Sequence, residues 1–166
     1  ITNNMIQNHS QVGIILQGAV SANIGVNSAS DSVASPNTIR NNGDGILLSG
    51  AAQANIIGNT IRNNLNNGIL LNRGAQANIA RNTINANAGD GIAVLEGAGA
   101  NLGGTSENTF GGILPLLGFT NNTTSNNGLF GIACGVGAYI AGNLGSLDGN
   151  SGAVGVIFDT TCNFTN

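Results

Sequence analysis

Carboxylate and guanidinium side chains recur at a fixed spacing in this chain, and they are the groups that could do chemistry. Asn67 lies midway between Asp44 and Asp90, 23 residues from each, and Arg40 precedes Arg62 by 22 residues. Paired carboxylates can hydrolyse glycosidic bonds, carboxylate and amide oxygens can bind Ca²⁺, and two neighbouring arginines can grip a carboxylated sugar. Each of these chemistries requires a fold that brings residues 22 or 23 positions apart side by side.

The remaining reactive side chains offer no further site. His9 has no serine or cysteine partner in register, and the sequence contains no metal-ligand spacing and no phosphate-binding loop. Lyases and epimerases need a base or acid together with a charge neutraliser, so an arginine pair without lysine, tyrosine or histidine nearby is a poor lyase site. We therefore predict no catalytic residue, no metal and no cofactor.

A repeat of 22 to 23 residues between Asn37 and Gly104 must position these groups. Each copy begins with Asn-Thr-Ile, continues through Gly-Ile followed two residues on by Leu or Val, and closes with Asn-Ile or Asn-Leu. The copies begin at Asn37, Asn59 and Asn82. A fixed period in the low twenties indicates a stacked-repeat architecture.

Each repeat holds three short apolar segments separated by Asn and Gly, which is the pattern of strands and turns. The Leu-x-x-Leu-x-Leu run of leucine-rich repeats is absent, and no segment has helical apolar spacing. The sequence therefore predicts an all-β fold, a parallel β-helix with three short strands per coil and about six to seven coils of 22–24 residues. At a strand spacing of about 4.8 Å, the backbones of Asp44 and Asp90 would lie about 9.6 Å apart, the wide end for an inverting pair.

Alternation along each strand sorts the side chains into a core and an outer face. We expect the core ladders to contain Ile39, Ile61, Ile84 and Phe110; Ile46, Ile69 and Ile92; Leu48, Leu71 and Val94; and Ile56, Ile79 and Leu102. Asparagine tolerates the left-handed backbone of sharp turns, and stacked asparagines can bond their amides to one another. We expect one such column at Asn55, Asn78 and Asn101 and another at Asn59 and Asn82.

The motif Asn-x-Ile-x-x-Asn, then Gly-Ile-x-Leu, then Asn-Ile resembles the parallel β-helix repeat family, the pectate-lyase-like right-handed β-solenoids. The resemblance is strong over residues 37–104 and looser on either side. It implies a right-handed coil and a secreted or cell-surface location, because the family includes secreted polysaccharide lyases and epimerases, surface adhesins and other extracellular proteins. It implies a fold and no particular chemistry.

The composition excludes several classes of partner. Only 7% of the 166 residues are charged, with no lysine and a net charge of -3, against about 25% charged residues in an ordinary soluble domain. Nucleic acid binding requires clustered cations, and no apolar run approaches the roughly eighteen residues of a membrane-spanning helix. We predict neither nucleic acid binding nor membrane insertion.

The chain forms a single β-helix domain over residues 1–166, with loop insertions predicted at 27–36 and 105–127. It begins at Ile1 without Met or a signal peptide, and we expect a processed or truncated chain. Cys134 and Cys162 are the two cysteines. A disulfide between them and a pair of buried free thiols are both open.

An apolar column on the outer face of the second strand is the candidate self-association surface. Its members are Ile15, Leu47, Leu70 and Ala93, and Leu65 at a turn extends it. The ends of a β-helix expose unpaired strands, and this chain has no capping helix, no lysine and little charge at either end. We predict a non-enzymatic extracellular structural protein that associates with itself, end to end or laterally, in a fibre, sheath, matrix or adhesin.

Two alternative functions remain open. In the first, the chain is a carbohydrate-binding or polysaccharide-processing module, lyase-like or epimerase-like, and Arg40, Arg62, Asp44 and Asp90 line a shallow groove. In the second, the outward threonines bind ice. Those threonines are Thr38, Thr60, Thr83 and Thr109. The second alternative is weaker because the same face carries two arginines and only one threonine per coil.

Overall fold

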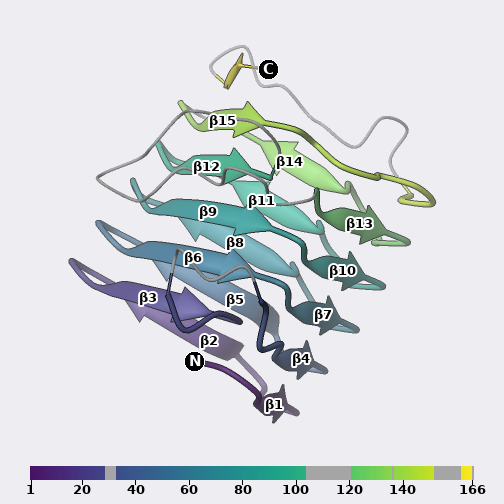
Figure 1. Cartoon of the computed structure of the whole chain (residues 1–166). Coiled ribbons are helices and arrows are strands. Elements are labelled where there is room, and N and C mark those ends of the chain that lie inside the picture. Colours follow the sequence, from purple (N-terminus) through teal and green to yellow (C-terminus); the bar gives the residue numbers. More distant parts are fainter. Residues whose placement is uncertain (29–32, 104–120, 136, 152–161, 166) are drawn as a thin grey trace.

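The computed structural model describes residues 1–28, 33–103, 121–135, 137–151 and 162–165. The described chain winds in a right-handed sense into a rod of stacked coils, in which parallel strands form three sheets and no helix occurs (Figure 1). Five coils each contribute one strand to each sheet, and one further strand extends the third sheet. The predicted fold class is confirmed, although the described residues form five complete coils where six to seven were expected. Residues one repeat apart are neighbours.

The three sheets follow the three strand positions of the repeat. The first contains β1 (Met5–Gln7), β4 (Thr38–Arg40), β7 (Thr60–Arg62), β10 (Thr83–Asn85) and β13 (Thr123–Ser125). The second contains β2 (Val12–Gln17), β5 (Asp44–Ser49), β8 (Ile69–Asn72), β11 (Ile92–Val94) and β14 (Ile132–Cys134). The third contains β3 (Ser21–Ile24), β6 (Gln53–Ile57), β9 (Gln76–Ala80), β12 (Gly99–Leu102), β15 (Tyr139–Gly142) and β16 (Asn163–Thr165).

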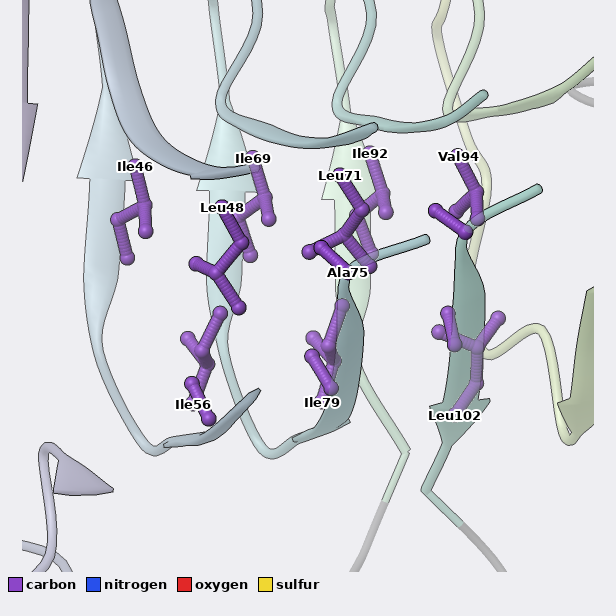
Figure 2. Packing of buried hydrophobic residues seen from close by; sticks show 14 of the residues in the cluster. Ile46, Leu48, Ile56, Ile69, Leu71, Ala75, Ile79, Ile92, Val94 and Leu102 are labelled. Carbon is purple, nitrogen blue, oxygen red and sulfur yellow. The ribbon is translucent and has the colours of Figure 1, made fainter. Parts of the chain in front are cut away.

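The interior consists of aliphatic ladders that run along the axis of the rod (Figure 2). Ile46 pairs with Ile69 and Leu48 with Leu71, so that like side chains stack on like. In the middle coils these side chains are fully buried. The expected inward residues of the second and third strands are all found there. Because each coil repeats the same shapes, close packing of one coil on the next follows directly from the repeat.

A sharp turn follows each strand of the first sheet, at a residue with positive φ. The residues at this turn are Asn8 (64°), Asn41 (54°), Asn63 (55°), Ala86 (53°) and Asn126 (53°). Asparagine is among the few non-glycine residues that adopt this left-handed conformation readily. After the first coil, the asparagine that follows this turn residue has a different role. Its side-chain amide belongs to a ladder of hydrogen bonds between neighbouring coils.

Two asparagine ladders flank the first sheet and are buried in the middle coils. The backbone N–H and the Nδ2 group of Asn59 both donate to Oδ1 of Asn82, at 2.9 and 3.1 Å. The Nδ2 group of Asn82 also donates to the carbonyl oxygen of Ile56 at 2.8 Å. The first ladder contains Asn4, Asn37, Asn59, Asn82 and Asn122, and the second contains Asn42, Asn64, Asn87, Asn127 and Asn150. These bonds satisfy amide groups that would otherwise be costly to bury.

A third ladder lies on the outer face of the third sheet. The Nδ2 groups of Asn55, Asn78 and Asn101 each donate to the Oδ1 atom of the asparagine in the preceding coil, at 2.8 to 3.2 Å. Its members are Asn23, Asn55, Asn78 and Asn101. Both predicted asparagine columns are therefore confirmed, and each contains additional members.

The predicted insertion at 105–127 is too long at its C-terminal end, because its last residues belong to a coil. β13 pairs with β10 so that Thr124 lies beside Ile84. The predicted place of Phe110 in this ladder is therefore wrong; Phe110 itself lies outside the described residues. Thr124 occupies the inward position that isoleucine holds in the other coils, so the sequence motif of the repeat is not recognisable there. Its hydroxyl group donates to the carbonyl oxygen of Ser146 at 3.2 Å, which allows it to be buried.

The predicted insertion at 27–36 is described only in part. Residues 33–36 lie outside the strands, and the backbone N–H of Ser35 donates to the carbonyl oxygen of Gly25 at 2.6 Å. Asp31, the one acidic residue of this segment, lies outside the described residues.

Candidate functional site

Asp44, Asn67 and Asp90 stack at the turn that precedes successive strands of the second sheet, as their spacing predicted. Oδ1 of Asp44 accepts from the backbone N–H and the Nδ2 group of Asn67, at 2.9 and 3.2 Å. Oδ1 of Asn67 accepts from the backbone N–H of Asp90 at 3.0 Å. Oδ1 of Asp90 accepts from the backbone N–H of Phe130, also at 3.0 Å. The three side chains therefore connect the turns of neighbouring coils.

This arrangement differs from the geometry of a carboxylate pair that hydrolyses glycosidic bonds. Asn67 lies between Asp44 and Asp90, and one oxygen of each carboxylate is engaged by a backbone N–H. In the part of the chain that the structure describes, no group of three or more His, Cys, Asp and Glu residues could hold a metal ion. One oxygen of each carboxylate therefore accepts hydrogen bonds within the fold.

The carboxyl group of Asp90 has a perturbed pKa. Desolvation by burial raises the pKa of its carboxyl group, and the hydrogen bond from the backbone of Phe130 opposes that rise. The folded chain therefore binds a proton at Asp90 more tightly than the unfolded chain does. The wild-type protein gains stability from this group as the pH falls from neutral towards the ordinary carboxyl pKa.

Replacing Asp90 by asparagine is expected to raise the free energy of unfolding at pH 7. The amide keeps an oxygen for the backbone N–H of Phe130 and removes the desolvated charge. The advantage over wild type should shrink as the pH falls from 7 towards the ordinary carboxyl pKa, because the raised pKa of Asp90 lets the folded wild type take up a proton before the unfolded chain does. Urea unfolding of both proteins at pH 7 and pH 4 measures the difference. A D90N protein that is less stable at pH 7 would contradict this account.

Arg40 and Arg62 are direct neighbours on the outer face of the first sheet. Nε of Arg40 donates to Oε1 of Gln7 at 2.8 Å. The one ion pair among the described residues joins Arg73 to Glu96, with 3.5 Å between Nε and Oε2, on exposed turns elsewhere. Within the described chain, therefore, no carboxylate neutralises Arg40 or Arg62. The predicted arginine pair forms, and it lies on a different sheet from the carboxylates.

A shallow trough of about 180 Å³ lies on β3 and β6 of the third sheet. Its lining consists of Ser21, Ala22, Asn23, Gln53, Ala54 and Asn55. The polar groups in it are uncharged amides and a hydroxyl. Asn23 and Asn55 belong to the third asparagine ladder. The trough is therefore suited to a neutral polar ligand, and the sequence analysis did not identify it.

The predicted apolar column on the second sheet forms, but its exposure falls along the rod. Ile15 pairs with Leu47, Leu47 with Leu70, and Leu70 with Ala93. Ile15 is 50% exposed, Leu47 and Leu70 are half-buried, and Ala93 is 1% exposed. The expectation that Ala93 belongs to an exposed column is wrong. Strand alternation gives the direction of a side chain, whereas its exposure depends on what else packs over it. Leu65 is exposed at its turn as expected.

Exposed apolar side chains gather in the first coil. Seven large apolar side chains are exposed among the described residues, and four of them lie within the first twenty positions. These four are Ile1, Met5, Ile15 and Val20. Three inward residues of this coil, Ile6, Leu16 and Ala22, are only partly buried, whereas their counterparts one coil further on are buried. The core residues of the first coil are therefore less completely buried than those of the coils that follow.

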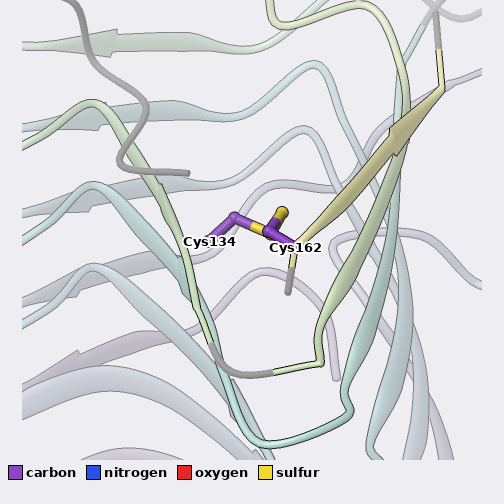
Figure 3. Close-up of a disulfide and its surroundings, with 2 residues drawn as sticks. All are labelled: Cys134 and Cys162. Carbon is purple, nitrogen blue, oxygen red and sulfur yellow. A yellow bond between two sulfur atoms is a disulfide. The ribbon is translucent and has the colours of Figure 1, made fainter. Parts of the chain in front are cut away.

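Cys134 and Cys162 are joined as a disulfide at the other end of the rod (Figure 3). Cys134 occupies an inward position at the end of β14 and is buried, and Cys162 is packed against the core just before β16. Their Cα atoms are 5.9 Å apart. The bridge ties the last strand of the third sheet to the interior of the second sheet.

One further feature besides the trough was not predicted from the sequence. The second asparagine ladder was visible as a repeated Asn at the sixth position of each Asn-Thr-Ile segment, and its members recur every 22 or 23 residues in the regular coils. The threonine column runs through Thr38, Thr60, Thr83 and Thr123. Thr123 takes the place predicted for Thr109.

Comparison with known families agrees with this geometry. The description "right handed beta helix region" matches residues 1–166, the whole chain. The chain belongs to the right-handed β-helix family. Members of this family include enzymes, pectate-lyase-like proteins among them, and proteins that are not enzymes. Searches of the curated proteins and of the solved structures found no significant match.

In this right-handed β-helix the buried polar side chains lie mainly in the asparagine ladders and at the turns. None of the described residues lies in a helix long and apolar enough to cross a membrane.

Proposed function

We propose that this β-helix is a non-enzymatic structural protein that associates with further copies of itself through its first coil. The observation that carries the proposal is the state of that coil, which exposes Ile1, Met5, Ile15 and Val20 and has no charged side chain. Charge repulsion keeps protein surfaces apart, and residues 1–30 contain no Asp, Glu, Lys or Arg. Apolar surface of this kind marks contacts between proteins.

The roles of the acidic groups support a structural function over an enzymatic one. Asp44 and Asp90 each accept hydrogen bonds from the next coil through one carboxylate oxygen, and they lie two coils apart. The polar residues of the regular coils likewise bond mainly to one another or to backbone groups. An active site needs reactive groups that converge on a substrate, and these side chains hold neighbouring coils together instead.

We place this function outside the cell, in a fibre, sheath, matrix or adhesin. The disulfide between Cys134 and Cys162 supports this location, because such bonds persist in oxidising compartments. The low content of charged side chains supports association, because charge repulsion keeps proteins apart.

Light scattering coupled to size exclusion tests the proposal. The wild-type chain should elute with a mass above the 16.5 kDa of one copy, and the mass should rise with concentration. Ile15→Lys should return the protein towards one copy, because a lysine there adds charge repulsion between copies. Leu129→Lys is the matched control, because Leu129 is 51% exposed and lies far along the rod. A monomeric wild-type protein at all concentrations would refute self-association.

The second candidate function is binding of a polysaccharide, and one observation favours it. Arg40 and Arg62 are stacked without a carboxylate partner in the described chain. Two neighbouring guanidinium groups suit the carboxylates of an acidic glycan. Asp44 and Asp90 do not share this face, so the groove with all four residues is not part of this candidate.

Co-sedimentation with insoluble polygalacturonate tests this second candidate. Binding should fall at least tenfold in the R40A/R62A double variant and should weaken with added salt. Arg73→Ala is the control, since that arginine lies on a different turn. Equal binding of the double variant and wild type would exclude the arginine pair as a glycan site.

A further inference from the structure

The trough on the third sheet is built from the same positions of two neighbouring strands, β3 and β6 (Figure 1). Ser21 pairs with Gln53, and Asn23 pairs with Asn55, so four polar side chains stand at its corners. The residue between each pair of corners is an alanine that packs against the core. Because side chains alternate between the two faces of a strand, the floor of the trough is backbone.

The two sides of the trough differ in the hydrogen bonds that they have already formed. On one side, the Nδ2 group of Asn55 donates to Oδ1 of Asn23 at 2.8 Å, and Oδ1 of Asn55 accepts from Asn78 at 2.9 Å. These amides are engaged between coils. On the other side, the hydroxyl group of Ser21 and the side-chain amide of Gln53 form no hydrogen bond in the described chain. Both groups can donate and accept, so this side keeps its hydrogen bonds for a ligand.

The charge and the size of the trough restrict the ligand. Its lining has no charged and no aromatic side chain, so a charged ligand would lose hydration there without gaining an opposite charge. An apolar ligand would cover the free hydroxyl and amide groups without bonding to them. The volume of about 180 Å³ lies below the roughly 300–1,000 Å³ of pockets for drug-sized molecules. A small neutral molecule with several hydroxyl groups fits these conditions.

We propose that the trough binds a neutral sugar ring, either as a free monosaccharide or as one unit of a neutral glycan. The ring lies on the backbone floor, and its hydroxyl groups bond to the side chains of Ser21 and Gln53. The inference goes beyond the proposed self-association and does not depend on it, because no exposed apolar side chain of the first coil lines the trough. The site is also separate from Arg40 and Arg62, which lie on the first sheet.

Chemical-shift titration of the isotope-labelled chain by nuclear magnetic resonance tests the inference. The probes are glucose, galactose, mannose and xylose, together with a soluble neutral oligosaccharide of each. At least one probe should shift the signals of residues 21–23 and 53–55 and reach saturation, with a millimolar dissociation constant because the trough is shallow. An oligosaccharide that binds about tenfold tighter than its monosaccharide identifies a glycan unit as the ligand. Equal affinities identify the free sugar.

Gln53→Met keeps the length of the side chain and removes its amide. It should weaken binding about fivefold or more, with an unchanged midpoint of urea unfolding, because the amide forms no hydrogen bond within the described chain. Gln17→Met is the matched control, since Gln17 is exposed at the end of β2 on the second sheet, and it should leave the affinity unchanged.

The inference is overturned if none of the sugars or oligosaccharides gives saturable shifts at the trough. Equal affinity of Gln53→Met and the wild-type protein would overturn it as well. Either result leaves self-association intact, since that proposal is tested by the mass in light scattering and not by sugar binding. A protein that binds a sugar at the trough as a monomer at all concentrations would instead support this inference and refute self-association.

Discussion

Replacing Asn82 by alanine is expected to lower the free energy of unfolding by about 3–5 kcal/mol. The substitution leaves the backbone N–H and the Nδ2 group of Asn59 without the acceptor they share. It also removes the donors to Ile56 O, at 2.8 Å, and to Oδ1 of Asn122, at 3.0 Å. All of these groups are buried, so water does not replace the lost partners. Urea unfolding followed by circular dichroism measures the loss.

Asn66→Ala is the matched control for this prediction. Asn66 is an exposed turn residue in the coil before Asn82 and has no side-chain hydrogen bond among the described residues. Its replacement should change the free energy of unfolding by no more than about 0.5 kcal/mol. A loss below about 1 kcal/mol for Asn82→Ala would mean that the ladder contributes little beyond its backbone bonds.

Replacing Ile61 by alanine is expected to cost about 2–5 kcal/mol of stability, and Ile61→Val about 0.5–1.5 kcal/mol. Ile61 is fully buried between Ile39 and Ile84 in the first-sheet ladder. The neighbouring coils are held in register by the asparagine ladders on both sides, so the chain cannot collapse freely into the cavity. Comparison of Ile61→Ala with Ile61→Val shows how the loss of stability depends on the size of the cavity.

Leu65→Ala removes a side chain of similar size from the same coil and serves as the control. Leu65 is 69% exposed, so its loss should change stability by no more than about 0.5 kcal/mol. Both losses are obtained from the midpoints of urea unfolding monitored by circular dichroism. Equal losses for Ile61→Ala and Leu65→Ala would contradict the assignment of the first to the interior and the second to the surface.

The fold could be predicted from the sequence because a β-helix is built from local repeats. The step from Asn37 to Asn59 to Asn82 determines which residues become neighbours, and strand alternation determines which of them face inward. The same arithmetic correctly stacked Arg40 on Arg62 and placed Asn67 between Asp44 and Asp90. Where the repeat was altered the prediction failed, because Thr124 replaces an isoleucine and the coil was not recognised.

What the sequence determined by itself is therefore the stacking of residues in columns along the rod. The tertiary structure decided how exposed each column is and what each polar atom bonds to. Ala93 shares a column with Ile15 yet is buried, and the carboxylates of Asp44 and Asp90 bond to the backbone of the following coil. Register within a repeat is a local property of the chain. Burial and hydrogen bonding depend on every segment that packs nearby, so they appear only when the whole chain is folded.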